Sequence, residues 1–377
     1  MIPYLVVFIL NLFLSYFANK CYNNNKKLSS IICIVVLVLT NTIFSGYRDF
    51  GIGVDTNVYI EPYFQRALSL NSFKDFFSGD DDKGFLILAY ISTLISNEPQ
   101  SFLVIIALFI QIFFYLSLWQ YKKIENISIF VATTLFCIVF YCHTLNLMRQ
   151  FCAISLLSFA FSLYIQEKFG PYVVLQVLAY FFHSTSVFFI LVPIIWKISN
   201  MKNIKMRNTY LGCLIIILII IIPLYYYIIT LLGNYSIISE VLVDRYGVNS
   251  EYLLSNSSYG TGIGKVFYFI YPIIFVSYAV YKKCSENTVL FFILVLTIIT
   301  SFVQVLGYKV QFVDRMGFYF SFIMYIFISK IFVSGKISTL IKTIIFAIYI
   351  INWISMYPIG GGGDVYPYTS KILNITK

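Results

Sequence analysis

The stretch "LGCLIIILIIIIPLYYYIITLL", Leu211–Leu232, decides the fold class because it carries no charged side chain over its whole length. A helix needs about 20 predominantly apolar residues to cross the hydrocarbon core of a bilayer. Soluble domains rarely contain an uncharged run of this length. The stretch therefore predicts a transmembrane helix.

Similar apolar runs recur from one end of the chain to the other. The 377 residues are 60% hydrophobic and only 11% charged, with a mean hydropathy of +0.85. We therefore expect an all-α, polytopic membrane protein in which residues 1–377 form one domain. The first run lacks a basic start and a small-residue cleavage site, which favours a retained helix over a signal peptide. The predicted transmembrane helices, about twelve, cover residues 2–18, 28–45, 101–119, 126–142, 147–165, 171–182, 184–198, 209–232, 265–281, 287–306, 316–333 and 337–356.

The distribution of basic residues predicts how these helices are oriented. Lysine and arginine collect in four connectors, at residues 19–27, 121–123, 196–207 and 281–284. By the positive-inside rule these connectors face the cytoplasm. All four can do so only if the short run 84–96 does not cross. We interpret that run as a re-entrant or interfacial helix on the outer side, and we place both termini outside.

Composition also argues against two other kinds of function. The net charge of +10 comes from basic residues scattered between apolar runs, which indicates orientation in the bilayer and no nucleic-acid partner. The seven cysteines have neither the spacing of a zinc site nor that of a disulfide framework. We expect neither a metal nor a cofactor.

Polar residues on the outer side are therefore candidates for function. They lie in the outer loops 46–83, 233–264 and 307–315, followed by an extracytoplasmic tail, 357–377. Two motifs in these segments read as structural. "DDD" (80–82) predicts an exposed acidic turn, because enzymes with a D-x-D motif need a soluble nucleotide-binding domain. "GGGGD" (360–364) predicts a flexible hinge.

The first polar group lies in "YRDFGIGVDTNVYIEPYF", residues 47–64, which holds Arg48, Asp49 and Asp55 beside two glycines. Glycine lets the backbone turn tightly and approach a ligand. We expect Asp55 to be the N-cap of a helix, with Tyr59 one turn later on the same face. The alternative is an Arg–Asp pair that only orders the loop.

The second and third groups lie at interrupted or costly positions in the membrane. Arg149 and Gln150 begin a long apolar helix, where a charge usually faces a cavity or a partner. His183 joins the two short apolar runs 171–182 and 184–198, and broken helices are tolerated only where protein or water satisfies the backbone. His183 is either a general base or a packed histidine.

A fourth group brings further basic and aromatic residues to the outer side. Arg315 and Tyr319 share a helical face, and Arg245 lies in the loop 233–264. Arginine binds phosphate oxygens bidentately and stays protonated at working pH. A phosphate carried by a lipid would lie at this depth. The residues thus indicate a site for a lipid-linked phosphorylated glycan.

At these residues the chain resembles the EpsG/Wzy-type polysaccharide polymerases of bacterial envelopes. The matching pieces are "YRDFGIGVDTNVY" (47–59), "LNLMRQFCAISLLSFAFSLYI" (145–165), "VLAYFFHSTSVFFILVPI" (177–194), "DRMGFYF" (314–320) and "VYPY" (365–368). Val54 departs from the pattern, which carries Thr or Ser at that position. The loop 233–264 matches nothing familiar, as expected where repeat-unit specificity resides.

The resemblance implies a metal-independent transferase in the bacterial cytoplasmic membrane, with its site on the outer face. A glycan would pass from undecaprenyl diphosphate to a sugar hydroxyl of the next lipid-linked unit. Asp55 or His183 would be the general base, with Asp55 preferred, and a chain-length regulator is a further candidate partner. The diphosphate would contact Arg48, Arg149 and Arg315, and the rest of the substrate would contact Asp49, Tyr59, Gln150, Arg245 and Tyr319.

Two other functions stay open at this point. A flippase or transporter for lipid-linked oligosaccharide also needs a basic cavity and broken helices, although no internal repeat favours it. A ligase of the O-antigen type would use the same donor with a different acceptor.

Overall fold

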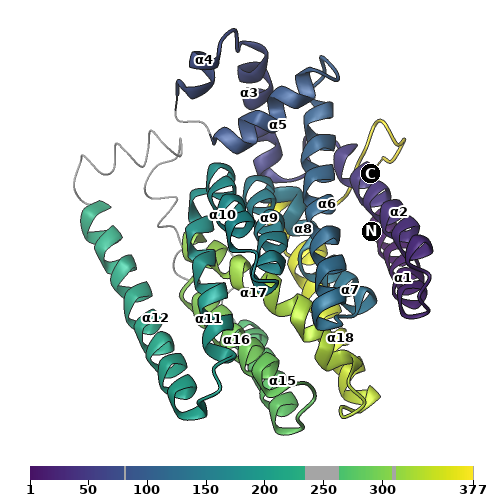
Figure 1. The fold of residues 1–377 in the computed structure, drawn as a ribbon. Coiled ribbons are helices and arrows are strands. Elements are labelled where there is room, and N and C mark those ends of the chain that lie inside the picture. The colour runs from purple at the N-terminus through teal and green to yellow at the C-terminus, as the bar shows by residue number, and fades with distance from the viewer. Residues whose placement is uncertain (80–81, 234–262, 308–310, 377) are drawn as a thin grey trace. The chain divides into compact units, whose positions relative to one another are not determined.

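The chain is described by a computed structural model that covers residues 1–79, 82–233, 263–307 and 311–376. Over these residues it folds into α-helices joined by short turns, 3-10 segments and one π-helical turn, which confirms the all-α prediction for the described part (Figure 1). Contacts divide the chain into two compact units, residues 1–187 with 338–377, and residues 188–337.

The first unit contains most of the predicted site. Its helices are α1 (Ile2–Asn23), α2 (Lys27–Gly46), α3 (Val54–Leu68), α4 (Phe73–Phe77), α5 (Lys83–Thr93), α6 (Gln100–Glu125), α7 (Ile129–Val139), α8 (Tyr141–Asn146), α9 (Met148–Ile165), α10 (Phe169–Phe182) and α18 (Thr339–Ile354), followed by the π-helix η2 (Ser355–Ile359) and the 3-10 helix η3 (Gly362–Asp364).

The second unit is built from fewer, mostly longer helices. These are α11 (Leu191–Ser199), α12 (Ile204–Gly233), α15 (Ile263–Tyr281), α16 (Asn287–Gly307) and α17 (Gln311–Val333). A 3-10 helix, η1 (Ser184–Ile190), runs from the first unit into the second.

Seven helices of the described residues are long and apolar enough to cross a membrane. They cover Ile2–Asn23, Lys27–Gly46, Gln100–Glu125, Met148–Ile165, Asn287–Val305, Arg315–Val333 and Thr339–Ile359. Shorter apolar helices lie over five further segments. A polytopic membrane protein is thus confirmed, whereas the count of about twelve spans stays a prediction.

Two predicted irregularities are present. The run 84–96 forms α5, which has only 11 residues and is therefore about 17 Å long, too short for a hydrocarbon core of about 30 Å. The break at His183 is also present, because α10 ends at Phe182 and His183 is extended, with φ −161° and ψ 119°. The second half differs from the prediction, since it begins as the 3-10 helix η1 before α11.

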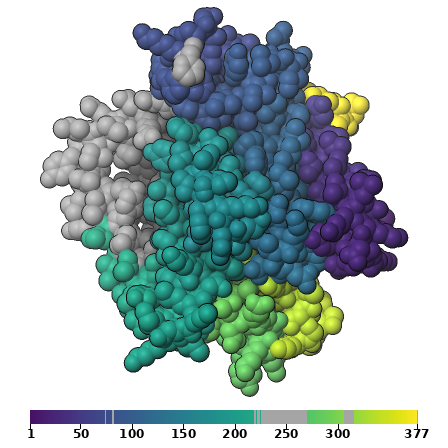
Figure 2. Space-filling view, viewed as in Figure 1, coloured from purple at the N-terminus to yellow at the C-terminus, as the bar shows by residue number. Residues whose placement is uncertain are grey.

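Buried polar side chains join α1, α2 and α6. Asn11 donates to Asn41 Oδ1 over 2.7 Å, and Asn41 donates to Gln111 Oε1 over 3.2 Å. Polar side chains between helices are favoured in a bilayer because lipid offers them no partner. In the space-filling view α1 and α2, in purple, lie against α6 and α7 (Figure 2).

Two of the basic connectors meet at one end of the first unit. At one end Lys122 donates to Asn126 and lies 5.5 Å from the ring of Tyr22, so the basic connectors 19–27 and 121–123 meet. At the other end lie α3, α4 and α5 (Figure 1). The start of α1 lies at this second end too, because Tyr4 donates to the carbonyl oxygen of Val365 near the C-terminus. Predicted cytoplasmic and predicted outer residues of this unit therefore separate.

Candidate functional site

The turn between α2 and α3 is built around Gly53. Its φ of +89° is a conformation that residues with a side chain rarely adopt. A Cβ atom at this position would lie 2.5 Å from the carbonyl oxygen of Leu145. Glycine is therefore required here, because the turn must lie directly against α8.

Arg48 is buried inside this turn, with 2% of its surface exposed. Its guanidinium donates to the carbonyl oxygens of Ser45, Ile52 (3.2 Å) and Leu145 (2.9 Å), and to Thr56 Oγ1 (3.1 Å). Burial lowers the pKa of Arg48 to about 10, so it stays protonated at neutral pH. This geometry favours a structural role for Arg48 over the predicted contact with a diphosphate.

The C-terminal segment binds the same turn. The N–H groups of Asp49 and Gly53 donate to the carbonyl oxygens of Thr369 and Asp364, each over 3.0 Å. Asp49 Oδ1 accepts the N–H of Lys371 over 2.9 Å, so this carboxylate, predicted to contact substrate, is engaged within the protein.

The sequence suggested a flexible hinge at the glycine run 360–364, but in the structure this run packs against α8. Gly363 has φ +67°, and a Cβ there would lie 2.9 Å from Nδ2 of Asn146. The prediction of a hinge was wrong because glycine here permits close packing against α8.

Helix α3 begins two residues earlier than predicted. Its N-cap is Gly53 and its first residue is Val54, so Asp55 lies in the first turn and is not the N-cap. The N–H of Asp55 donates to Asn146 Oδ1 over 3.1 Å, and its carboxylate is half-buried. The predicted pairing with Tyr59, one turn later on the same helix face, is retained.

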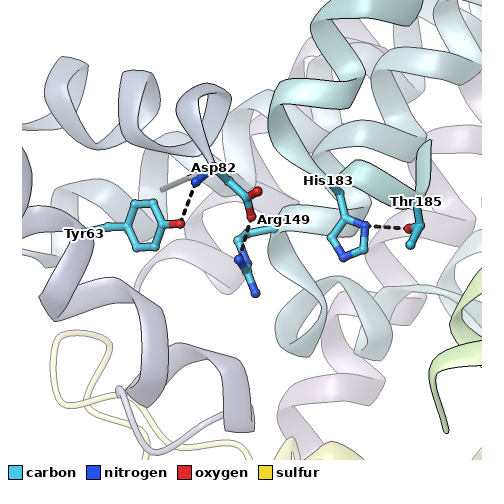
Figure 3. A network of polar contacts seen from close by, with 5 residues as sticks. All are labelled: Tyr63, Asp82, Arg149, His183 and Thr185. Carbon is cyan, nitrogen blue, oxygen red and sulfur yellow. Dashed lines mark hydrogen bonds and ion pairs between the residues drawn. The ribbon is translucent and has the colours of Figure 1, made fainter. Parts of the chain in front are cut away.

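Arg149 is the central cation of the site. Its guanidinium carbon lies 3.7 Å from the centroid of the Tyr59 ring, and Nη1 lies 2.6 Å from Asp82 Oδ2 (Figure 3). The side chain is 18% exposed, and among the described residues its buried Nε has no hydrogen-bond partner. The carboxylates of Asp82 and Asp55 both act on this charge.

Asp82 is the site residue that sequence reasoning missed. It was read as part of an exposed acidic turn, but its side chain is only 24% exposed and pairs with Arg149. Its N–H donates to the hydroxyl of Tyr63 over 3.0 Å (Figure 3). The available signal was the cost of an uncompensated arginine at a helix start, which requires an acidic partner somewhere in the outer loops.

A second glycine places His183 at this end of the unit. Gly84 packs so closely on α10 that a Cβ would lie 2.9 Å from the ring of Phe182, the residue before His183. His183 is half-buried, and its Nδ1 lies 2.6 Å from Thr185 Oγ1 (Figure 3). The start of α5, with Asp82, and the end of α10 are therefore neighbours.

The remaining predicted residues are buried, lie in the second unit, or lie outside the described residues. Gln150 is buried, with 2% of its surface exposed. Arg315 is half-buried and Tyr319 is fully buried, both on α17 of the second unit, so the predicted meeting of Arg315 with Arg149 joins the two units and stays a prediction. Arg245 lies outside the described residues.

An apolar cavity of about 160 Å³ lies between α1, α7, α8 and α18. Tyr4, Tyr141, Cys142 and Trp353 belong to its lining. The hydroxyls of both tyrosines are engaged elsewhere, since Tyr4 donates to Val365 and Tyr141 accepts from Ser45. The cavity therefore presents mainly hydrocarbon and aromatic surface, which suits an apolar ligand.

The site thus combines one accessible cation with two carboxylates. A guanidinium can bind and stabilise an anion, and a nearby carboxylate can accept a proton. Among the described residues no group of three or more His, Cys, Asp or Glu side chains could hold a metal ion.

Comparison with known proteins gives one match. A sequence model of the EpsG family matches residues 31–370, nearly the whole chain. Neither a curated protein nor a solved structure matches the chain.

Proposed function

The chain belongs to the EpsG family, a family of Wzy-type membrane polysaccharide polymerases, and we propose that it polymerises lipid-linked oligosaccharide repeat units. In this proposal the growing glycan is carried by undecaprenyl diphosphate. The hydroxyl oxygen of the incoming unit attacks the anomeric carbon, the bond to the diphosphate breaks, and its electron pair leaves with the diphosphate oxygen.

The observation that carries the proposal is the position of Arg149. It is a partly exposed guanidinium at the start of an apolar helix, held by a carboxylate and an aromatic ring. Negative charge grows on the diphosphate as it leaves. A fixed cation aimed at that group stabilises the transition state more than the ground state. Arg149 is the proposed leaving-group residue, and Arg315 is the second candidate.

Asp55 is the proposed general base. It lies one helical turn before Tyr59, on which Arg149 is stacked, so a hydroxyl near the bound diphosphate is within reach of its carboxylate. His183, at the neighbouring end of α10, is the alternative base. Tyr59 offers an aromatic face to a sugar ring. Arg48 and Asp49 act by holding the turn that positions α3.

The apolar cavity is the proposed binding site for the lipid part of the substrate. Cys142 in its lining lies four residues before Asn146, which binds the N–H of Asp55. Four residues of helix extend over about 6 Å. An apolar cavity of about 150 Å³ accepts a benzene-sized ligand. In this proposal the first isoprene unit of a polyprenyl chain occupies this cavity while the diphosphate reaches the polar end of α8.

The topology predicted from basic residues would put this site on the outer face of the bacterial cytoplasmic membrane. The separation of basic connectors from the site within the first unit supports that orientation. It also favours a transferase over a flippase, which would need polar groups along its whole passage.

Reconstitution tests the proposal. The full chain in proteoliposomes is supplied with lipid-linked repeat units extracted from a strain that lacks it, and the products are separated on a gel. We expect a ladder of lengths, which a flippase does not make. Arg149→Ala should lower the rate roughly 100- to 1,000-fold, the usual effect of removing one such donor.

The matched control is Arg66→Ala. Arg66 lies on α3 in the same outer segment, but it binds the carbonyl oxygens of Asp75 and Ser78. The control should keep a normal ladder. A ladder of normal length and rate from Arg149→Ala would exclude the proposed role of this residue.

A further inference from the structure

Asp82 occupies a position from which its side chain has two possible partners. It is the N-cap residue of α5, with φ −66° and ψ 102°. From this extended conformation an aspartate usually accepts a backbone N–H from the second or third residue of its own helix. Here the side chain makes no such bond and instead contacts Arg149. The usual cap of α5 is therefore given up for the ion pair.

Arg149 needs a counter-ion whenever the site is empty. The guanidinium is only 18% exposed, and the described residues offer its Nε no acceptor. A charge taken out of water in this way is costly unless it is paired. Asp82 meets that need over 2.6 Å. An arriving anion would meet the same need, and the carboxylate would then be released.

We propose that Asp82 is a positioning residue that holds Arg149 in the empty site and yields it to the diphosphate of the substrate. On release, its carboxylate caps α5 by accepting the N–H of Gly84, since the N–H of Phe85 already donates to the carbonyl oxygen of Asp82. The inference rests on the proposed function, since it takes a diphosphate as the ligand of Arg149. No bond within the protein chain is made or broken; one acceptor replaces another at the guanidinium.

Three features keep the free-energy cost of this exchange low. The displaced carboxylate finds a new donor, so neither state leaves it uncompensated. Tyr59 stays under the guanidinium in both states, so Arg149 need not move. The cap lies beside Gly84, which packs on Phe182 directly before His183. Diphosphate binding, which leads to capping of α5, would thus also affect the end of α10, where His183, the alternative base, follows.

Binding measurements test the exchange. The full chain in detergent is titrated with farnesyl diphosphate. A competing internal partner weakens the apparent affinity by the fraction of protein in which Arg149 is available. Asp82→Asn removes the competing charge and should lower Kd by about tenfold, as expected if roughly 10% of Arg149 is available in the parent. Asp82→Ser, which can cap but cannot pair, should lower Kd equally.

Hydrogen exchange distinguishes this role from a purely structural one. In the parent protein, exchange at the amide of Gly84 should slow when farnesyl diphosphate binds. In Asp82→Ser it should be slow before the ligand is added. In Asp82→Ala, which has no cap, the ligand should leave it unchanged. The matched control, Asp75→Asn, removes a carboxylate of the same outer segment that accepts the N–H of Asn71, and should behave as the parent.

The outcomes separate the inference from the proposed function. If Kd is equal or higher in both Asp82→Asn and Asp82→Ser, while Arg149→Ala still abolishes binding, the inference is wrong and the diphosphate site stands. If Arg149→Ala binds farnesyl diphosphate as tightly as the parent, both are wrong. Lower Kd values together with the predicted exchange pattern support the inference.

Discussion

Replacement of Gly53 by alanine tests the turn on which the whole site depends. Gly53 has φ +89°, and its new methyl group would lie 2.5 Å from the carbonyl oxygen of Leu145 and 3.1 Å from Thr56 Oγ1. Both of these atoms accept hydrogen bonds from Nη2 of Arg48. The substitution therefore strains the backbone and separates the buried guanidinium from two acceptors at once.

The size of the effect follows from these contacts. A left-handed conformation costs a residue with a Cβ roughly 1–2 kcal/mol. Inserting a methyl group into a packed site costs about 1–3 kcal/mol, and here the neighbouring atom is backbone that cannot rotate away. The free energy of unfolding should therefore fall by roughly 2–5 kcal/mol. For a chain of 377 residues, a change of that size lowers Tm by roughly 3–6 °C.

Gly51→Ala provides the matched control. It lies two residues earlier in the same turn, has no positive φ, and a Cβ there would meet nothing within 4 Å. Its effect should stay within about 0.5 kcal/mol. Tm is measured for both variants from tryptophan fluorescence in detergent. Equal Tm values for the two variants would refute the contact between the turn and α8.

Two further predictions concern the remaining polar groups. Arg48→Met should lower the free energy of unfolding by about 3 kcal/mol or more, because several buried carbonyl oxygens lose their donor. Size-exclusion chromatography should then show little monodisperse protein. A normal yield and Tm would contradict the structural role of Arg48. Polymerisation should continue at an unchanged rate in excess chelator, because the arginines supply the positive charge that a metal ion would otherwise bring to the leaving group; loss of the ladder, with recovery on adding Mg²⁺, would contradict this.

Local patterns in the sequence predicted the helices well. Apolar length identified the long helices, and the short run 84–96 indicated the short helix α5; that α5 lies on the outer side without crossing stays a prediction. The break at His183 was predictable because its signal is local: a short polar stretch separates two apolar runs that are each short for a membrane span. Asp55, Tyr59 and Arg149 were assigned to one predicted site, and the structure brings Arg149 into contact with the Tyr59 ring.

Contacts between distant segments could not be predicted in this way. Asp82 and Arg149 are 67 residues apart, and Tyr368 donates to Phe44 across 324 residues. A run such as "GGGGD" is compatible with flexibility or with close packing, and only the neighbouring surface of α8 decides between them. The distribution of basic residues predicts the side of the membrane on which an arginine lies, but not whether its side chain points inward.

Arg48 and Arg149 show why that direction matters for function. Both are cations at the same end of the first unit, and Arg48 even contacts Met148, the residue before Arg149. The acceptors of Arg48 are mainly backbone carbonyl oxygens, which are fixed by the turn and α8, so a ligand cannot replace them without unfolding the turn. Among the described residues, the acceptor of Arg149 is the carboxylate of Asp82, on a side chain that can rotate. An arginine is available to a substrate when its resting partner can leave, and of these two only Arg149 meets that condition.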